Sequence, residues 1–210
     1  MGARQRFRGR IAGVGSTSGV RVVVGWWHES PFGPFADAMV ERADGHRLLV
    51  APTEQVADLV SSTYVFDEVR VEPEAGAGCS AGRPGNQLST QLQFTSPSLA
   101  LTLEIGDRMP LGHLLRLVPG ALSASLAFAT AVDPVARVVL RGVRTRGQAR
   151  GGRREYYGAS DMRAVTTMTG VLDGIPLGDL RPVDPPCRFG FSSTPRSPSV
   201  TDVVTTIVYA

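Results

Sequence analysis

Two charged side chains stand where the strand patterns of this chain predict buried apolar residues. Asp67 shares one face of the predicted strand 64–72 with three valines, and Arg154 shares a face of the predicted strand 154–168 with Tyr156 and two methionines. A buried charge is costly unless it is paired. An aspartate and an arginine inside one barrel could pair with each other, or the arginine could bind a ligand carboxylate. The alternative is that both side chains lie near strand ends and reach water.

These charges and the nearby aromatic residues predict one internal cavity. Aromatic rings would supply its apolar walls, and a guanidinium would offer a fixed fork of hydrogen-bond donors. The expected ligand-binding residues are Trp26, Tyr64, Asp67, Arg154 and Tyr156. The same barrel could instead carry acid–base catalysis, since paired carboxylates at a pocket push their pKa values apart. The candidate acids or bases for that chemistry are Asp67, Glu68, Asp37 and Glu155.

Several other chemistries are excluded or disfavoured by residue type. All 22 basic residues are arginine, so a lysine Schiff base and a P-loop lysine are impossible. The three histidines have no metal-ligand spacing, and Cys79 and Cys187 lie far apart, so we expect no metal and no cofactor. Residues 13–19 are glycine-rich but precede a predicted strand, which indicates a flexible turn rather than a dinucleotide loop.

A dense basic span, Arg137 to Arg154, holds seven arginines and no acid. It would suit a phosphate or nucleic-acid patch, or a partner protein, but it is more typical of a solvated helix face that runs into a mobile glycine-rich loop. No aromatic residue lies between the arginines, and the net charge of the chain is only +3. Nucleic-acid binding is therefore kept as an alternative and is disfavoured.

The elements that must position these residues are mostly strands. Alternation of apolar and polar residues predicts strands over 20–27, 36–42, 47–51, 64–72, 154–172 and 200–209. The clearest hairpin should bury one face of the segment 88–105, formed by Leu88, Leu92, Phe94, Leu99, Leu101, Leu103 and Ile105. Short helices are expected after Pro52 and between residues 111 and 142. The order favours an α+β fold: a curled, largely antiparallel sheet or cone-like barrel with a few short helices in the middle of the chain.

A length of 210 residues, with 42% hydrophobic and 20% charged residues, fits one domain over 1–210. Its first 19 residues are expected to form a flexible basic N-terminus. We find no signal peptide and no apolar run long enough to span a bilayer. The chain is expected to be cytoplasmic, without a membrane partner, and a homo-oligomer stays open.

The run Ser30-Pro31-Phe32-Gly33-Pro34-Phe35-Ala36-Asp37 resembles the Ser-Pro-x-Gly-Pro-Tyr-x-Glu strand opening of acetoacetate decarboxylase-like proteins. The likeness covers roughly residues 20–72 and extends to actinobacterial proteins of this length. It implies a cone-like barrel that holds a small keto or carboxylic acid. The family's functional lysine is missing, since the corresponding stretch reads Val65-Phe66-Asp67-Glu68-Val69. The resemblance therefore implies a small-molecule-binding barrel without Schiff-base catalysis, or an acid–base enzyme of the lyase or hydratase type on the same barrel.

Overall fold

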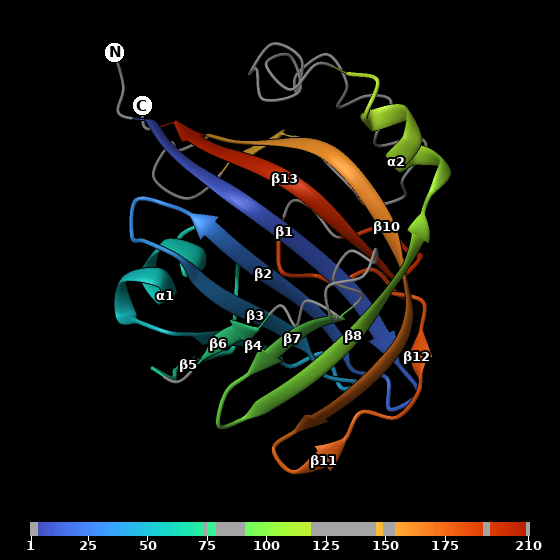
Figure 1. The fold of residues 1–210 in the computed structure, drawn as a ribbon. Helices are drawn as coiled ribbons and strands as arrows, with labels where there is room; N and C mark the ends of the chain where they lie inside the picture. The colour runs from blue at the N-terminus through green and yellow to red at the C-terminus, as the bar shows by residue number, and fades with distance from the viewer. Residues whose placement is uncertain are drawn as a thin grey trace.

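The computed structural model describes residues 4–73, 75–78, 91–118, 146–148, 154–190 and 194–208, and one large sheet dominates them (Figure 1). The two helices in this part of the chain are α1 (Glu54–Ser61) and α2 (Pro110–Leu115). The strands are β1 (Arg4–Ser16), β2 (Arg21–Glu29), β3 (Phe35–Glu41), β4 (Arg47–Ala51), β5 (Glu68–Val71), β6 (Gly76–Gly78), β7 (Gln91–Thr95), β8 (Leu99–Arg108), β9 (Arg146–Gln148), β10 (Arg154–Leu172), β11 (Ile175–Pro176), β12 (Leu180–Arg181) and β13 (Ser199–Val208).

The strands form one sheet in the order β5-β4-β3-β2-β1-β13-β10-β8-β7-β6, with β9 and β11 paired to β10 and β12 paired to β1. Every pair is antiparallel except β4–β5, which is parallel because α1 crosses over between them. The end strands β5 and β6 are not hydrogen-bonded to each other in the described residues. The expected curled, largely antiparallel sheet is confirmed, and it is curled rather than closed.

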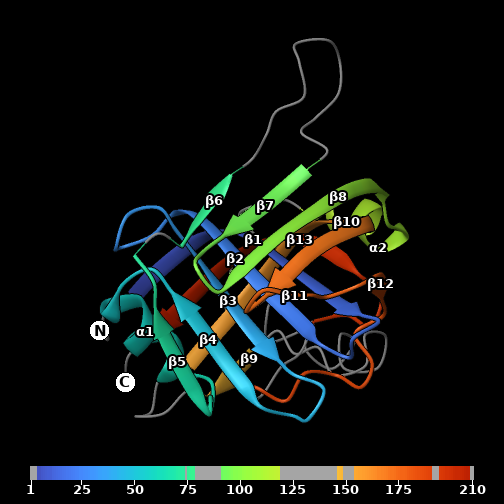
Figure 2. The same cartoon turned by 90° about the horizontal axis from the view of Figure 1, so that it is seen from below.

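The main core fills the inside of this curl. Seen from below, the sheet bends until β7 and β8 lie opposite the strands β2 to β4 (Figure 2). Leucines and a phenylalanine of the β7–β8 hairpin pack there against the valines of β2 to β4; those of the hairpin are Leu92, Phe94, Leu99, Leu101 and Leu103. The predicted inner face of this hairpin is confirmed for these five. Ile105 is only partly buried, and Leu88 lies outside the described residues.

The outer face of the sheet is covered by α1 and by the segment 182–190. The α1 helix begins after Thr53, whose hydroxyl accepts a hydrogen bond from the Val56 N–H, and it buries Val56 and Ala57 against β4. Phe189 packs against Phe66 with ring centroids 5.7 Å apart. The sheet therefore has apolar layers on both faces, and a cavity can form on either.

The expectation of a flexible N-terminus over residues 1–19 is wrong for residues 4–16, which form β1 between β2 and β13. Arginines at 4, 6, 8 and 10 alternate with Gln5, Phe7, Gly9 and Ile11, and Phe7 is buried. That period of two is the signature of a strand with one buried face, even though the other face is basic.

The face assigned to the strand 64–72 is also wrong. The valines that share a side with Asp67 are exposed, because β5 is an edge strand and its opposite side turns toward the inside of the curl. Of the helices expected between residues 111 and 142, the first is α2, and those after residue 118 lie outside the described residues, as does the basic span apart from β9 and the start of β10. No helix in the part of the chain that the structure describes is long and apolar enough to cross a membrane.

Candidate functional site

A cavity of about 70 Å³ lies on the outer face of the sheet, beneath α1 and the turn that follows it. A buried water needs roughly 10–15 Å³ of such space, so the cavity has room for several waters or a small organic molecule. Strands β1, β2, β3, β10 and β13 form its floor. The lining residues are mostly apolar, with a few polar groups among them: Phe7, Ile11, Val23, Gly25, Trp27, Phe35, Asp37, Met39, Leu59, Val60, Thr63, Tyr64, Glu155, Tyr157, Thr205 and Ile207.

Strand register brings Asp37 to this cavity. Asp37 of β3 lies opposite Gly25 of β2, and the Trp27 side chain on the same face donates its indole N–H to Asp37 Oδ1 over 2.9 Å. Gly25 makes this contact possible, since a Cβ there would lie 2.6 Å from the indole nitrogen and 2.7 Å from the carboxylate oxygen. The glycine thus leaves the space in which the two side chains meet.

The Asp37 carboxyl is 5% exposed, and the described residues supply no hydrogen bond to its second oxygen, Oδ2. Burial raises the pKa of Asp37 from 3.8 to about 6, and the Trp27 hydrogen bond opposes part of that rise. The group therefore changes charge close to neutral pH. A buried carboxyl with an open oxygen in a cavity has the properties of a ligand-binding or acid–base group.

A second carboxyl, Glu155 of β10, lines the same cavity and is 4% exposed. Thr63 Oγ1 donates to it over 2.5 Å, and the Tyr157 hydroxyl donates over 2.8 Å. The Tyr64 hydroxyl shares a hydrogen bond of 2.6 Å with that of Tyr157, so Thr63, Tyr64, Tyr157 and Glu155 form one hydrogen-bonded network. Burial, together with the charge of Glu155, raises the pKa of both tyrosines well above 10, so both stay protonated.

Aromatic rings close the end of the cavity near the β2–β3 turn. The Phe7 ring packs edge-on against Trp27 at 5.9 Å and against Phe35 at 6.4 Å between centroids. The turn itself is held by Ser30, whose hydroxyl accepts from the Phe32 N–H and donates to the Gly33 carbonyl. The segment that carries the resemblance to acetoacetate decarboxylase-like proteins thus builds an aromatic wall and leads into Asp37.

Of the expected ligand-binding residues whose side chains the structure describes, Trp26, Tyr64, Asp67 and Tyr156, it brings only Tyr64 to this cavity. Trp26 lies on the opposite face of β2, in the core inside the curl, and donates its indole N–H to the Gln93 carbonyl. Tyr156 lies between two cavity residues of β10 but faces the other side of the sheet. Arg154 pairs through its backbone with Val208, and its side chain lies outside the described residues.

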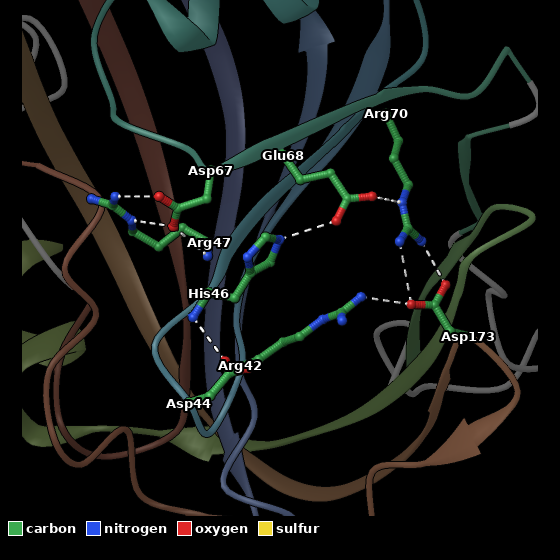
Figure 3. Close-up of polar contacts among 8 residues, drawn as sticks. All are labelled: Arg42, Asp44, His46, Arg47, Asp67, Glu68, Arg70 and Asp173. Carbon is green, nitrogen blue, oxygen red and sulfur yellow. Dashed lines mark hydrogen bonds and ion pairs between the residues drawn. The ribbon is translucent and has the colours of Figure 1, made fainter.

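Asp67 lies at the surface, where Arg47 binds both of its carboxylate oxygens (Figure 3). These two hydrogen bonds hold the pKa of Asp67 well below its usual value. Glu68 joins the same surface cluster and contacts His46 and Arg70. The four candidate acids therefore separate into two surface residues satisfied by arginine and two cavity residues, Asp37 and Glu155.

Trp27, Thr63 and Tyr157 are cavity residues that the sequence reasoning did not select. Trp27 and Tyr157 each lie next to a selected aromatic residue, one position along the strand and thus on the other face. Tyr157 could have been found from the sequence, because it lies two positions from the candidate acid Glu155 and so shares its face of the strand, whereas the face that Trp27 shares with Asp37 depends on the register of two strands. Thr63 follows α1 and carried no pattern of its own.

No family model, curated protein or solved structure matched the chain. In the part of the chain that is described, no group of three or more His, Cys, Asp or Glu side chains could hold a metal ion.

Proposed function

We propose that the protein binds a small organic molecule in the outer-face cavity between the sheet and α1. The observation that carries this proposal is Asp37: a carboxyl that is 95% buried in an apolar cavity, with one oxygen held by Trp27 and the other open among the described residues. Burying an acid in this way costs folding free energy, and a ligand that contacts the open oxygen would recover it. Trp27, Tyr64 and Tyr157 would orient the bound molecule.

The charges of the cavity lining also restrict the class of ligand that we expect to bind. A small keto or carboxylic acid was expected, but two carboxyls and no basic side chain are among the described residues that line the cavity. A ligand carboxylate would meet like charge there, whereas a neutral or cationic group would not. The resemblance to acetoacetate decarboxylase-like proteins stays a prediction, and the proposal does not depend on it.

The two tryptophans of the chain provide a direct test. In a proton–nitrogen correlation spectrum each indole N–H gives one signal. A fragment that enters the cavity should shift the Trp27 signal and leave the Trp26 signal, which belongs to the opposite core, in place. Fragments that bind should lose affinity in Asp37→Asn and keep it in Asp67→Asn, a surface substitution of identical chemistry. If no fragment moves Trp27, or if Asp37→Asn binds every fragment unchanged, the proposal is wrong.

Acid–base catalysis in the same cavity is a second candidate function, because two carboxyls in different surroundings line this cavity. Asp37 has a single donor and a pKa raised to about 6, whereas Glu155 receives bonds from Thr63 and Tyr157. A carboxyl poised near neutral pH can take a proton from a carbon next to a carbonyl and return one from water. We expect such an enzyme to exchange the α-hydrogens of a bound ketone in deuterium oxide. Exchange that is equally fast in Asp37→Asn would contradict this role.

A further inference from the structure

The charge and the walls of the cavity suggest a specific class of ligand. Asp37 has no cationic partner among the described residues, and its one hydrogen bond comes from the neutral indole of Trp27. The arginines of the neighbouring strands are held elsewhere: Arg21 of β2 binds buried Glu41 at 3.0 Å, and Arg10 of β1 binds Asp202 at 2.9 Å. An ionised Asp37 therefore lacks a counterion that the described part of the fold supplies.

The walls beside Asp37 suit a cation. Trp27, which contacts the carboxyl, lies against Phe7 at 5.9 Å and Phe35 at 6.3 Å between ring centroids, and all three rings line the cavity with Asp37. The negative faces of aromatic rings attract ammonium groups, and tryptophan does so most strongly. The hydroxyls of Tyr64 and Tyr157 stay protonated and add no charge of their own.

We infer that the cavity accepts a small organic ammonium ion, with the ammonium group on Asp37 and the carbon chain against the aromatic and aliphatic wall. This inference rests on the proposed small-molecule binding and names its ligand class. The available space, about 70 Å³, limits the ligand to a few heavy atoms beyond the ammonium group.

The ammonium ion must pair with ionised Asp37, so its binding should depend on pH. The titratable groups that line the cavity with Asp37 are Glu155, Tyr64 and Tyr157, and both tyrosines stay neutral at ordinary pH. Affinity for an alkylammonium ion, which keeps its charge at all these pH values, should rise as pH increases through about 6. In Asp37→Asn that rise should disappear.

Three probes of similar size separate the possibilities: propylammonium, 1-propanol and propionate. We expect propylammonium to shift the Trp27 indole signal and to bind most tightly. Asp37→Asn should weaken it by about tenfold to a hundredfold, the value of a hydrogen bond between charged groups. Asp67→Asn should bind like the unmodified protein, and circular dichroism should confirm that both variants fold.

The outcomes distinguish this inference from the proposal it rests on. If propanol or propionate binds as tightly as propylammonium and shifts Trp27, the ligand class is wrong and small-molecule binding stands. If propylammonium binds with the same affinity in Asp37→Asn, the assigned contact is wrong. If these probes and the fragment screen all leave Trp27 unmoved, the proposed function itself fails.

Discussion

At the scale of single residues, the burial of Asp37 should be measurable as a dependence of stability on pH. Its folded pKa of about 6 lies above the ordinary 3.8, so the folded state holds this proton more tightly than the unfolded state. The free energy of unfolding should therefore increase as pH falls from above 6 toward 4. Asp37→Asn keeps an acceptor for Trp27 and removes the charge. We expect it to be about 1–3 kcal/mol more stable than the unmodified protein at pH 7.5.

Urea unfolding at pH 5 and pH 7.5 measures this difference, which should shrink at the lower pH. Asp67→Asn is the control of opposite sign, since arginine contacts lower the pKa of Asp67 and its charged form is the stabilising one. A variant at position 37 that is less stable than the parent at pH 7.5 would show that the charge of Asp37 is compensated within the fold.

Glu41 is a fully buried acid whose role is structural. Its carboxylate binds Arg21 at 3.0 Å and Arg188 at 3.1 Å, and Arg21 is itself buried. Glu41→Gln leaves Arg21 without its countercharge, and breaking a buried pair on one side costs about 3–5 kcal/mol. The exposed pair of Asp184 and Arg196 provides the control, since Asp184→Asn should cost about 1 kcal/mol or less. Equal losses in the two variants, measured by urea unfolding, would contradict the assigned difference.

At the scale of elements, the β7–β8 hairpin is the clearest case of a strand pair that buries one face. Leu99 is fully buried and lies opposite Leu172 of β10. Leu99→Ala should cost about 2–5 kcal/mol, because it removes buried methyl groups and leaves a cavity. Glu104→Ala, on the exposed face of the same strand, should change stability by about 0.5 kcal/mol or less. Thermal or urea unfolding of both variants tests the assignment, and a loss below 1 kcal/mol for Leu99→Ala would contradict it.

Local patterns explain which elements could be predicted. Apolar and polar residues alternate regularly in the β7–β8 hairpin, so its buried face was predictable. The alternation in β1 is equally regular, but the arginines on its exposed face made the segment resemble a flexible basic tail. The buried side of β5 was not predictable, because alternation separates two faces without saying which one a neighbouring element covers.

The candidate site was predictable only in part for a related reason. Asp37 and Glu155 stood among the candidate acids, but the cavity depends on strand register and on α1, which lies over the sheet. The opposition of Gly25 and Asp37 depends on the register of the β2–β3 hairpin, and the contact of Thr63 with Glu155 joins residues 92 positions apart in the sequence. Residue spacing within one strand carries no information about such contacts.

At the scale of the whole molecule, the curl is held at its open side by polar contacts rather than by strand pairing. Asp173, in the β10–β11 turn, binds Arg70 of β5 and Arg42, which follows β3 (Figure 3). The same turn donates its Asp173 N–H to the Ser98 carbonyl, and the Ser98 N–H is bonded to Glu72. The β10–β11 turn and the β7–β8 turn are thereby tied to the β5 end of the sheet.

Replacing Asp173 with asparagine measures how much its charge contributes to the stability of the contacts between the β10–β11 turn and β5. Asp173 has a positive φ of 51°, a conformation that asparagine tolerates, so Asp173→Asn should keep the turn and lose only the two ion pairs. The partners are partly exposed, so the loss should be about 1 kcal/mol or less, and 1 M salt should remove most of it, since the screening length falls to about 3 Å. The measurement is urea unfolding at low and high salt, with Arg70→Gln and the double variant completing a cycle. A loss above 2 kcal/mol that salt does not change would mean that Asp173 shapes the turn itself, and that backbone geometry rather than charge holds the β10–β11 turn against β5.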